Sequence, residues 1–117
     1  MKFHNTEFCF VKQNSVSLFL MRIVTFLRIK EFTKKYPDAD IALRDWYLKT
    51  QKSNWNNLSD IKQTFNTVDY VGNNRFVFNI RGNSYRLIAI IIFASKKVYI
   101  RFIGTHREYD KIDASKI

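Results

Sequence analysis

The stretch RFVFNIRGNSYRLIAIIIFASKKVYIRFIGTHREYD, residues 75–110, decides the fold. It predicts three consecutive β-strands, Arg75–Ile80, Tyr85–Ala94 and Val98–Gly104, because each run is rich in β-branched and aromatic residues. The segments RGNS and SKK between the runs contain residues typical of tight turns. The sequence therefore predicts an antiparallel β-meander.

Turn length sets the expected pairing of the strands. Loops of two or four residues give the same register, with Phe78 opposite Leu87, Ile91 opposite Ile100 and Ala89 opposite Phe102. Side chains alternate across a strand, so this register sorts the sheet into two unlike faces. One face is apolar throughout and consists of Phe76, Phe78, Ile80, Tyr85, Leu87, Ala89, Ile91, Phe93, Val98, Ile100 and Phe102.

The other face carries the cations. The expected register places Asn79, Arg86 and Thr105 in one row and Arg75, Ile90 and Arg101 in the next. Guanidinium groups without a carboxylate repel one another unless an anion lies between them, so this face is predicted to bind phosphate. The alternative is that the arginines only edge a solvated face. The aliphatic residues between them favour the phosphate interpretation, because a solvated face does not need them.

Length and composition limit the possible functions. A chain of 117 residues forms one domain, and 20 Lys and Arg against 10 Asp and Glu give +10, which points to a polyanion, either nucleic acid or a membrane surface. The longest uncharged apolar run, Leu87–Ala94, is too short to span a bilayer, which needs about 20 residues. We therefore expect no membrane insertion.

Cysteine, histidine and glycine usage argues against bound cofactors. The single Cys9 can form no internal disulfide and suits a cytoplasmic protein, and His4 and His106 are too few for a metal-site pattern. No glycine motif of a nucleotide-cofactor enzyme is present. We expect neither a metal nor a small-molecule cofactor.

Residues 1–20 show no persistent helical or strand periodicity and no signal-peptide pattern. Met21 begins a much clearer pattern. Our hypothesis is that residues 1–20 are an N-terminal extension, that translation starts at Met21, and that residues 21–117 form a single domain.

The segment before residue 75 predicts one strand and three helices. The strand covers Arg22–Thr25, and a basic helix containing Leu27 and Tyr36 ends before Pro37. Asp38 or Asp40 is expected to cap a second helix through about Lys52, with Trp46 in the core; Ser59 is expected to cap a third. The predicted fold class is α+β with two layers: the N-terminal strand and helices pack on the apolar face of the meander, and the arginine face is left open.

The segment THREYD adds groups that can transfer protons. RNA cleavage without a metal needs a proton acceptor for the 2′-OH, cations for the charged phosphorus and a proton donor for the leaving oxygen. The predicted catalytic residues are Arg86, Arg101, His106 and Tyr109, and the predicted RNA-phosphate contacts are Arg75, Asn79, Lys34, Lys35 and Arg107. A purely structural interpretation of THREYD is a capping box between Thr105 and Glu108, which is compatible with the catalytic one.

The segments FVFNIRGNSYRLIAII, KKVYIRFIGTHREYD and EFTKKYPDA together resemble the HigB-type toxins of the RelE/ParE superfamily. The resemblance implies a RelE-like fold and a ribosome-dependent mRNA endonuclease that cuts translated messages in the ribosomal A site. It also implies a cognate helix-turn-helix antitoxin that neutralises the toxin. By position, Arg86 is the arginine of GN-x-x-R, Arg101 that of YIR, and His106, Tyr109 and Asp110 belong to TH-x-EYD. Residues 1–20 have no counterpart in this pattern.

Three functions remain open at this point. The first is a metal-independent endoribonuclease that uses the 2′-OH and leaves a 2′,3′-cyclic phosphate. The second is a non-catalytic RNA- or ribosome-binding inhibitor of translation, and the third is a ParE-like gyrase inhibitor. A histidine beside the arginines favours the first, because binding alone needs cations but no imidazole.

Overall fold

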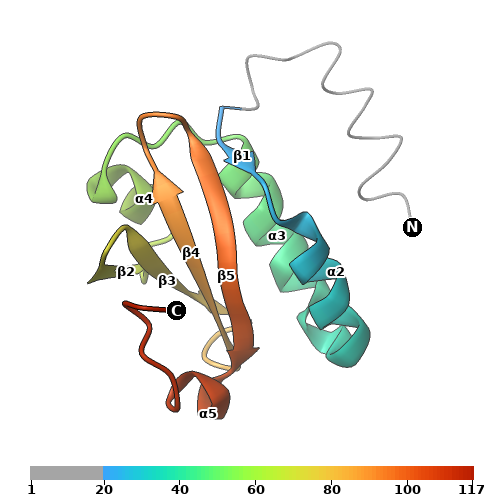
Figure 1. Ribbon diagram of the computed structural model, residues 1–117. Helices are drawn as coiled ribbons and strands as arrows, with labels where there is room; N and C mark the ends of the chain where they lie inside the picture. The colour runs from blue at the N-terminus through green and yellow to red at the C-terminus, as the bar shows by residue number, and fades with distance from the viewer. Residues whose placement is uncertain (1–19) are drawn as a thin grey trace.

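The computed structural model describes residues 20–117, which form a five-stranded sheet with helices on one side (Figure 1). The strand order is β1-β5-β4-β3-β2, with β1 parallel to β5 and the other pairs antiparallel. The α+β fold class is confirmed. The elements in chain order are β1 (Arg22–Ile23), α2 (Phe26–Lys35), a 3₁₀ turn (Pro37–Ala39), α3 (Asp40–Gln51), α4 (Leu58–Thr64), β2 (Asp69–Gly72), β3 (Arg75–Ile80), β4 (Tyr85–Ile92), β5 (Lys97–Thr105) and α5 (His106–Tyr109).

The proposed extension 1–20 lies, except for Leu20, outside the described residues, so it stays a prediction. The strand predicted at Arg22–Thr25 is the short edge strand β1. Strand β2 on the opposite edge was not predicted. Its few residues lack an apolar alternation, and it is held as a strand only by pairing with β3.

The helices form where periodicity indicated, but two predicted caps are wrong. Ala39 is the N-cap residue of α3, so neither Asp38 nor Asp40 caps it. Asp40 lies inside the first turn and pairs with Arg44 at 3.1 Å. Asn57, not Ser59, caps α4, since its side-chain oxygen accepts the N–H of Asp60 at 2.9 Å. No helix within residues 20–117 is long and apolar enough to cross a membrane.

The predicted apolar face is the core of the protein. Helices α2 and α3 lie alongside β5 in Figure 1. Trp46 of α3 is 1% exposed and packs against Phe78, with the two ring centroids 5.4 Å apart. The aromatic ring of Phe32 in α2 packs edge-on against Tyr85 at 5.3 Å. Because this burial removes large apolar side chains from water, the core fixes which face of every strand is inward.

The register between β3 and β4 is confirmed, including Phe78 opposite Leu87. The register predicted between β4 and β5 is wrong. Ile91 pairs with Val98 rather than Ile100, because the turn occupies residues 93–96. Lys96 adopts a left-handed φ of 59°, and its ammonium group donates to the carbonyl oxygen of Trp55 at 3.0 Å, a long-range contact that fixes the turn.

A β-bulge then changes the faces of the last part of β5. Ala89 pairs with Ile100 but Ile88 pairs with Phe102, so Arg101 is the extra residue. Phe102 consequently joins the face of Ile88 instead of the core face, and Ile103 takes the core side opposite Leu87. The prediction that Phe102 lies in the core is therefore wrong.

The face opposite the helices is less open than predicted. Val77 and Ile88 lie on it and are 4% and 0% exposed. The chain beyond α5 turns back toward β3 in Figure 1, where Asn73 donates to the carbonyl oxygen of Ser115 at 2.9 Å. The C-terminal segment therefore runs back to the start of β3, where Ser115 and Ile117 accept hydrogen bonds from Asn73 and Arg75.

Candidate active site

The candidate site lies at the end of the sheet where β5 passes into α5. Thr105 caps α5 by accepting the N–H of Glu108 at 3.1 Å, and Glu108 accepts the N–H of Thr105 at 2.9 Å. The predicted capping box is confirmed. It fixes the direction of a helix too short to be stable alone, and thereby the side chains of His106 and Tyr109.

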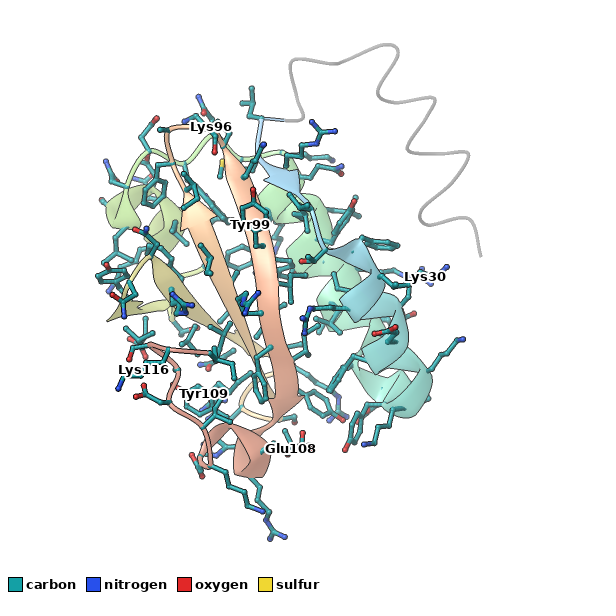
Figure 2. The ribbon with its side chains drawn as sticks, viewed as in Figure 1. Lys30, Lys96, Tyr99, Glu108, Tyr109 and Lys116 are labelled. Atoms are coloured by element: carbon teal, nitrogen blue, oxygen red, sulfur yellow. The ribbon has the colours of Figure 1, made fainter. Side chains whose placement is uncertain are left out.

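Tyr109 turns back toward the sheet (Figure 2) and meets Arg86 of β4. The guanidinium carbon of Arg86 lies 5.7 Å from the ring centroid of Tyr109, a cation–π distance. Arg86 Nη1 also donates to the carbonyl oxygen of Asn83 at 3.4 Å. These two contacts hold the planar guanidinium at the edge of the face while leaving donors for a ligand.

His106 stands on the exposed side of the same helix turn. Its Nδ1 lies 3.3 Å from Asp110 Oδ2, at the (i, i+4) spacing that places two side chains together. The imidazole is 51% exposed. Nε2 is therefore the nitrogen available to a bound molecule.

The expected rows of the face are partly wrong. Asn79 and Arg86 are paired as predicted, but Gly104, not Thr105, completes their row. The row of Arg75 and Ile90 ends in Tyr99 rather than Arg101, because the turn between β4 and β5 is shifted. Figure 2 shows Tyr99 on β5.

Arg75 does not adjoin Arg86. It lies four residues from Asn79 along β3, roughly 13 Å at about 3.3 Å per residue, and the row of Val77 and Ile88 intervenes. Its Nε donates to the backbone oxygen of Ile117 at 2.9 Å and its Nη1 to the carbonyl oxygen of Asn73 at 3.0 Å. The structure thus does not bring the three arginines into two neighbouring rows.

The remaining predicted residues divide between two surfaces. Arg101 is exposed at the bulge and Arg107 is exposed on α5. Lys34 and Lys35 are exposed in the last turn of α2, in the helical layer behind the sheet. They lie at the same end of the molecule, since Phe32 of that helix contacts Tyr85, whose strand partner is Thr105.

Tyr85 at this end and Asp113 in the C-terminal segment have a shifted pKa for structural reasons. The Tyr85 hydroxyl donates to Asp38 Oδ1 at 2.6 Å, and this bond, followed by burial, raises the pKa of Tyr85 above its ordinary 10.0. Hydrogen bonds from Ser115 lower the pKa of Asp113. Tyr85 therefore remains a neutral linker between sheet and helices, and Asp113 a charged anchor of the C-terminal segment.

Sequence reasoning missed Asn83 and Gly104. Asn83 acts through its carbonyl oxygen, which any residue supplies. Gly104 is buried beside Arg86, and a Cβ there would overlap the Phe102 ring and stand 2.8 Å from Glu108 Oε1. The only sequence signal for it was a small residue directly before the THREYD segment.

Residues 20–117 contain no group of three or more His, Cys, Asp or Glu side chains arranged to hold a metal ion.

Comparison with known proteins finds relatives that cover most of the chain. The family model HigB_toxin, described as the RelE-like toxic component of a toxin-antitoxin system, matches residues 39–112. The mRNA interferase toxin HigB of Escherichia coli strain K12 is 32% identical over 93 residues, covering 77% of this chain and 88% of that protein. The mRNA interferase HigB of Escherichia coli O6:H1 strain CFT073 is 29% identical over 94 residues, covering 79% and 91%. The chain therefore belongs to the HigB toxin family, the RelE-like toxic components of toxin-antitoxin systems.

Proposed function

We propose that this chain is an mRNA interferase, a ribosome-dependent endoribonuclease that inhibits translation, with Arg86, His106 and Tyr109 at its site. The observation that carries the proposal is the geometry of α5. One capping box directs Tyr109 onto Arg86, while Asp110 holds His106 with Nε2 outward. A cation and a phenol in contact, and an imidazole on the same short helix, thus lie at one end of the sheet, in a family whose relatives include mRNA interferases.

The proposed reaction needs no metal ion. Nε2 of His106 accepts the proton of the 2′-OH, and the 2′-oxygen attacks the adjacent phosphorus. Arg86, assisted by Arg101, stabilises the charge that develops on the phosphoryl oxygens. The bond from phosphorus to the 5′-oxygen breaks, and that oxygen takes the proton of Tyr109. The products are a 2′,3′-cyclic phosphate and a free 5′-hydroxyl.

The surrounding cations would hold the RNA backbone. Asn79 is paired with Arg86, and Arg107 is exposed on α5, so both can contact phosphates beside the cleaved one. Lys34 and Lys35 would contact RNA that passes the helical layer. Arg75 already donates to Ile117 and Asn73, so it would contribute through its remaining N–H donors. In this proposal the toxin acts in the cytoplasm and is neutralised by a cognate helix-turn-helix antitoxin.

Substitution of the three proposed groups tests the function. His106→Gln removes the proton acceptor and should lower the cleavage rate of ribosome-bound message by about a hundredfold to ten-thousandfold. Arg86→Ala should cost about 3 kcal/mol of transition-state stabilisation, roughly a hundredfold or more. Both variants should also relieve growth arrest in cells. Arg22→Ala, an exposed arginine on the edge strand β1, is the matched control and should cleave at the parent rate.

Product analysis separates this function from its alternatives. Cleavage that persists in EDTA and leaves a 2′,3′-cyclic phosphate supports the proposed reaction. Folded His106→Gln and Arg86→Ala proteins that still cleave at the parent rate would place the site elsewhere. Ribosome binding that stops translation without any cut message would favour a non-catalytic inhibitor, and inhibition of purified gyrase would favour a ParE-like activity.

A further inference from the structure

A cavity of about 300 Å³ opens at the outer edge of β3, beside the candidate site. It lies between the end of α4, the segment that follows it, and the last residues of β3. Its lining includes Gln63, Phe65, Asn66, Thr67, Phe78 and Asn79. No charged side chain lines it, which disfavours a phosphate or an ion as its occupant.

The edge of β3 presents unpaired backbone groups to this cavity. The N–H of Ile91 donates to the carbonyl oxygen of Asn74 at 3.0 Å. Hydrogen bonding alternates along an antiparallel pair, so Phe78 bonds to β4 and Asn79 turns its N–H and C=O outward. The pairing of β2 with β3 ends at Val77, and no backbone partner for Asn79 occurs on that side within residues 20–117.

The polar side chains around the cavity are also unused. The side chains of Gln63, Asn66 and Asn79 make no hydrogen bond to any residue between 20 and 117. Thr64 differs from them, since its hydroxyl accepts the indole N–H of Trp55 at 3.1 Å and belongs to the scaffold. Unused amides and a strand edge together provide both donors and acceptors in one place.

The apolar part of the lining is anchored in the core: Phe78 is 1% exposed, so of the two lining rings the half-buried Phe65 has the accessible surface. The rings of Phe65 and Phe78 meet edge to face at 5.5 Å, and both belong to the aromatic cluster that includes Trp55. A planar group with apolar faces and a hydrogen-bonding rim matches such a lining. Nucleobases have this character, and unpaired RNA bases are recognised by amide side chains, backbone groups and aromatic rings.

We propose that this cavity receives one base of the message next to the cleaved phosphodiester and thereby selects which codons are cut. The inference rests on the proposed function, because it takes the phosphate to lie at Arg86. Asn79 connects the two places: it lines the cavity and pairs with Arg86 in the closer, non-hydrogen-bonded manner, with Cα atoms about 4.5 Å apart. Gln63 and Asn66 are the residues that determine specificity.

Codon-resolved cleavage tests the selection. Gln63→Ala and Asn66→Ala, singly and together, should alter the relative cleavage rates of different codons by about tenfold, the discrimination that a good amide–base pair provides. Total cleavage should change much less than in Arg86→Ala. Both residues are exposed, so the fold is not at risk. Asn54→Ala, an exposed amide before α4 and outside the cavity, should leave the codon profile unchanged.

Nucleotide binding tests the cavity without any cleavage. In NMR titrations of the full chain, nucleoside 5′-monophosphates should shift the backbone amides of Asn66, Thr67 and Asn79, and ribose 5-phosphate, which has no base, should not. The Gln63→Ala, Asn66→Ala protein should lose these shifts. Absence of shifts at these amides with all four nucleotides, or equal shifts with ribose 5-phosphate, overturns the inference. A parent protein that shows the shifts but cuts no message would refute the proposed function and leave the base-binding cavity standing.

Discussion

The side chain of Tyr109 can contribute to cleavage in two ways. Its ring stacks against Arg86, and its hydroxyl is the group proposed to protonate the leaving oxygen. A ring that only positions a guanidinium and a phenol that transfers a proton give different results when the hydroxyl alone is removed. This distinction decides whether the candidate site has a general acid at Tyr109.

Tyr109→Phe should therefore be compared with Tyr109→Ala. If the phenol donates the proton, Tyr109→Phe loses about a hundredfold or more in single-turnover cleavage, although the ring still supports Arg86. Tyr109→Ala loses this and the positioning of Arg86. A phenylalanine variant at the parent rate, with only the alanine variant impaired, would remove Tyr109 from proton transfer and leave it a positioning role.

At the scale of elements, the sequence predicted correctly the features that depend on neighbouring residues, and it did not predict those that depend on residues far apart in the chain. The turn RGNS gave the correct β3–β4 register, and the Thr105–Glu108 spacing gave the start of α5, since both depend on neighbouring residues. The β4–β5 register could not be derived, because Lys96 is held by Trp55, 41 residues away. The bulge at Arg101 lies inside a strand, so no turn residue in the sequence indicates it. Together with the shifted turn, it makes Gly104, not Thr105, the partner of Arg86.

The bulge explains why Gly104 is needed beside Arg86. Phe102 shares its face with Gly104, so a methyl group at position 104 would press on the Phe102 ring and on Glu108 Oε1, the acceptor in the capping box. Both are side-chain ends that can move. Gly104→Ala should thus cost about 1 kcal/mol in a urea titration, the lower end for an added methyl group. The cleavage rate should fall by a larger factor than this loss of stability corresponds to, because the added methyl group displaces α5 and with it His106 and Tyr109.

A second-site change provides the control for this prediction. Phe102→Leu shortens the side chain that the new methyl group meets first, so the double variant should recover part of the lost cleavage. A Gly104→Ala protein with normal cleavage would show that α5 tolerates the shift. Equal loss in the single and the double variant would show that the Glu108 contact, not the ring, is the constraint.

At the scale of the whole molecule, the charge of +10 is distributed over both layers. Arg86, Arg101 and Arg107 lie on the side of α5, and Lys34 and Lys35 end the helix α2 behind the sheet. Residues of the first group are close enough to the proposed reaction to affect its rate. The second group can affect only how tightly RNA is held, which makes binding and chemistry separable by substitution.

Ribosome binding should weaken steeply with salt, because each neutralised phosphate releases counterions. With about four phosphate contacts, affinity should fall on the order of a hundredfold between 50 and 200 mM salt. Lys34→Ala with Lys35→Ala should reduce the slope of log affinity against log salt by about two, and should leave cleavage at saturating ribosome unchanged. Lys52→Ala, at the opposite end of the helical layer, is the matched control. An unchanged slope in the double lysine variant would confine the RNA to the α5 side, and a flat salt response in the parent protein would contradict phosphate binding altogether.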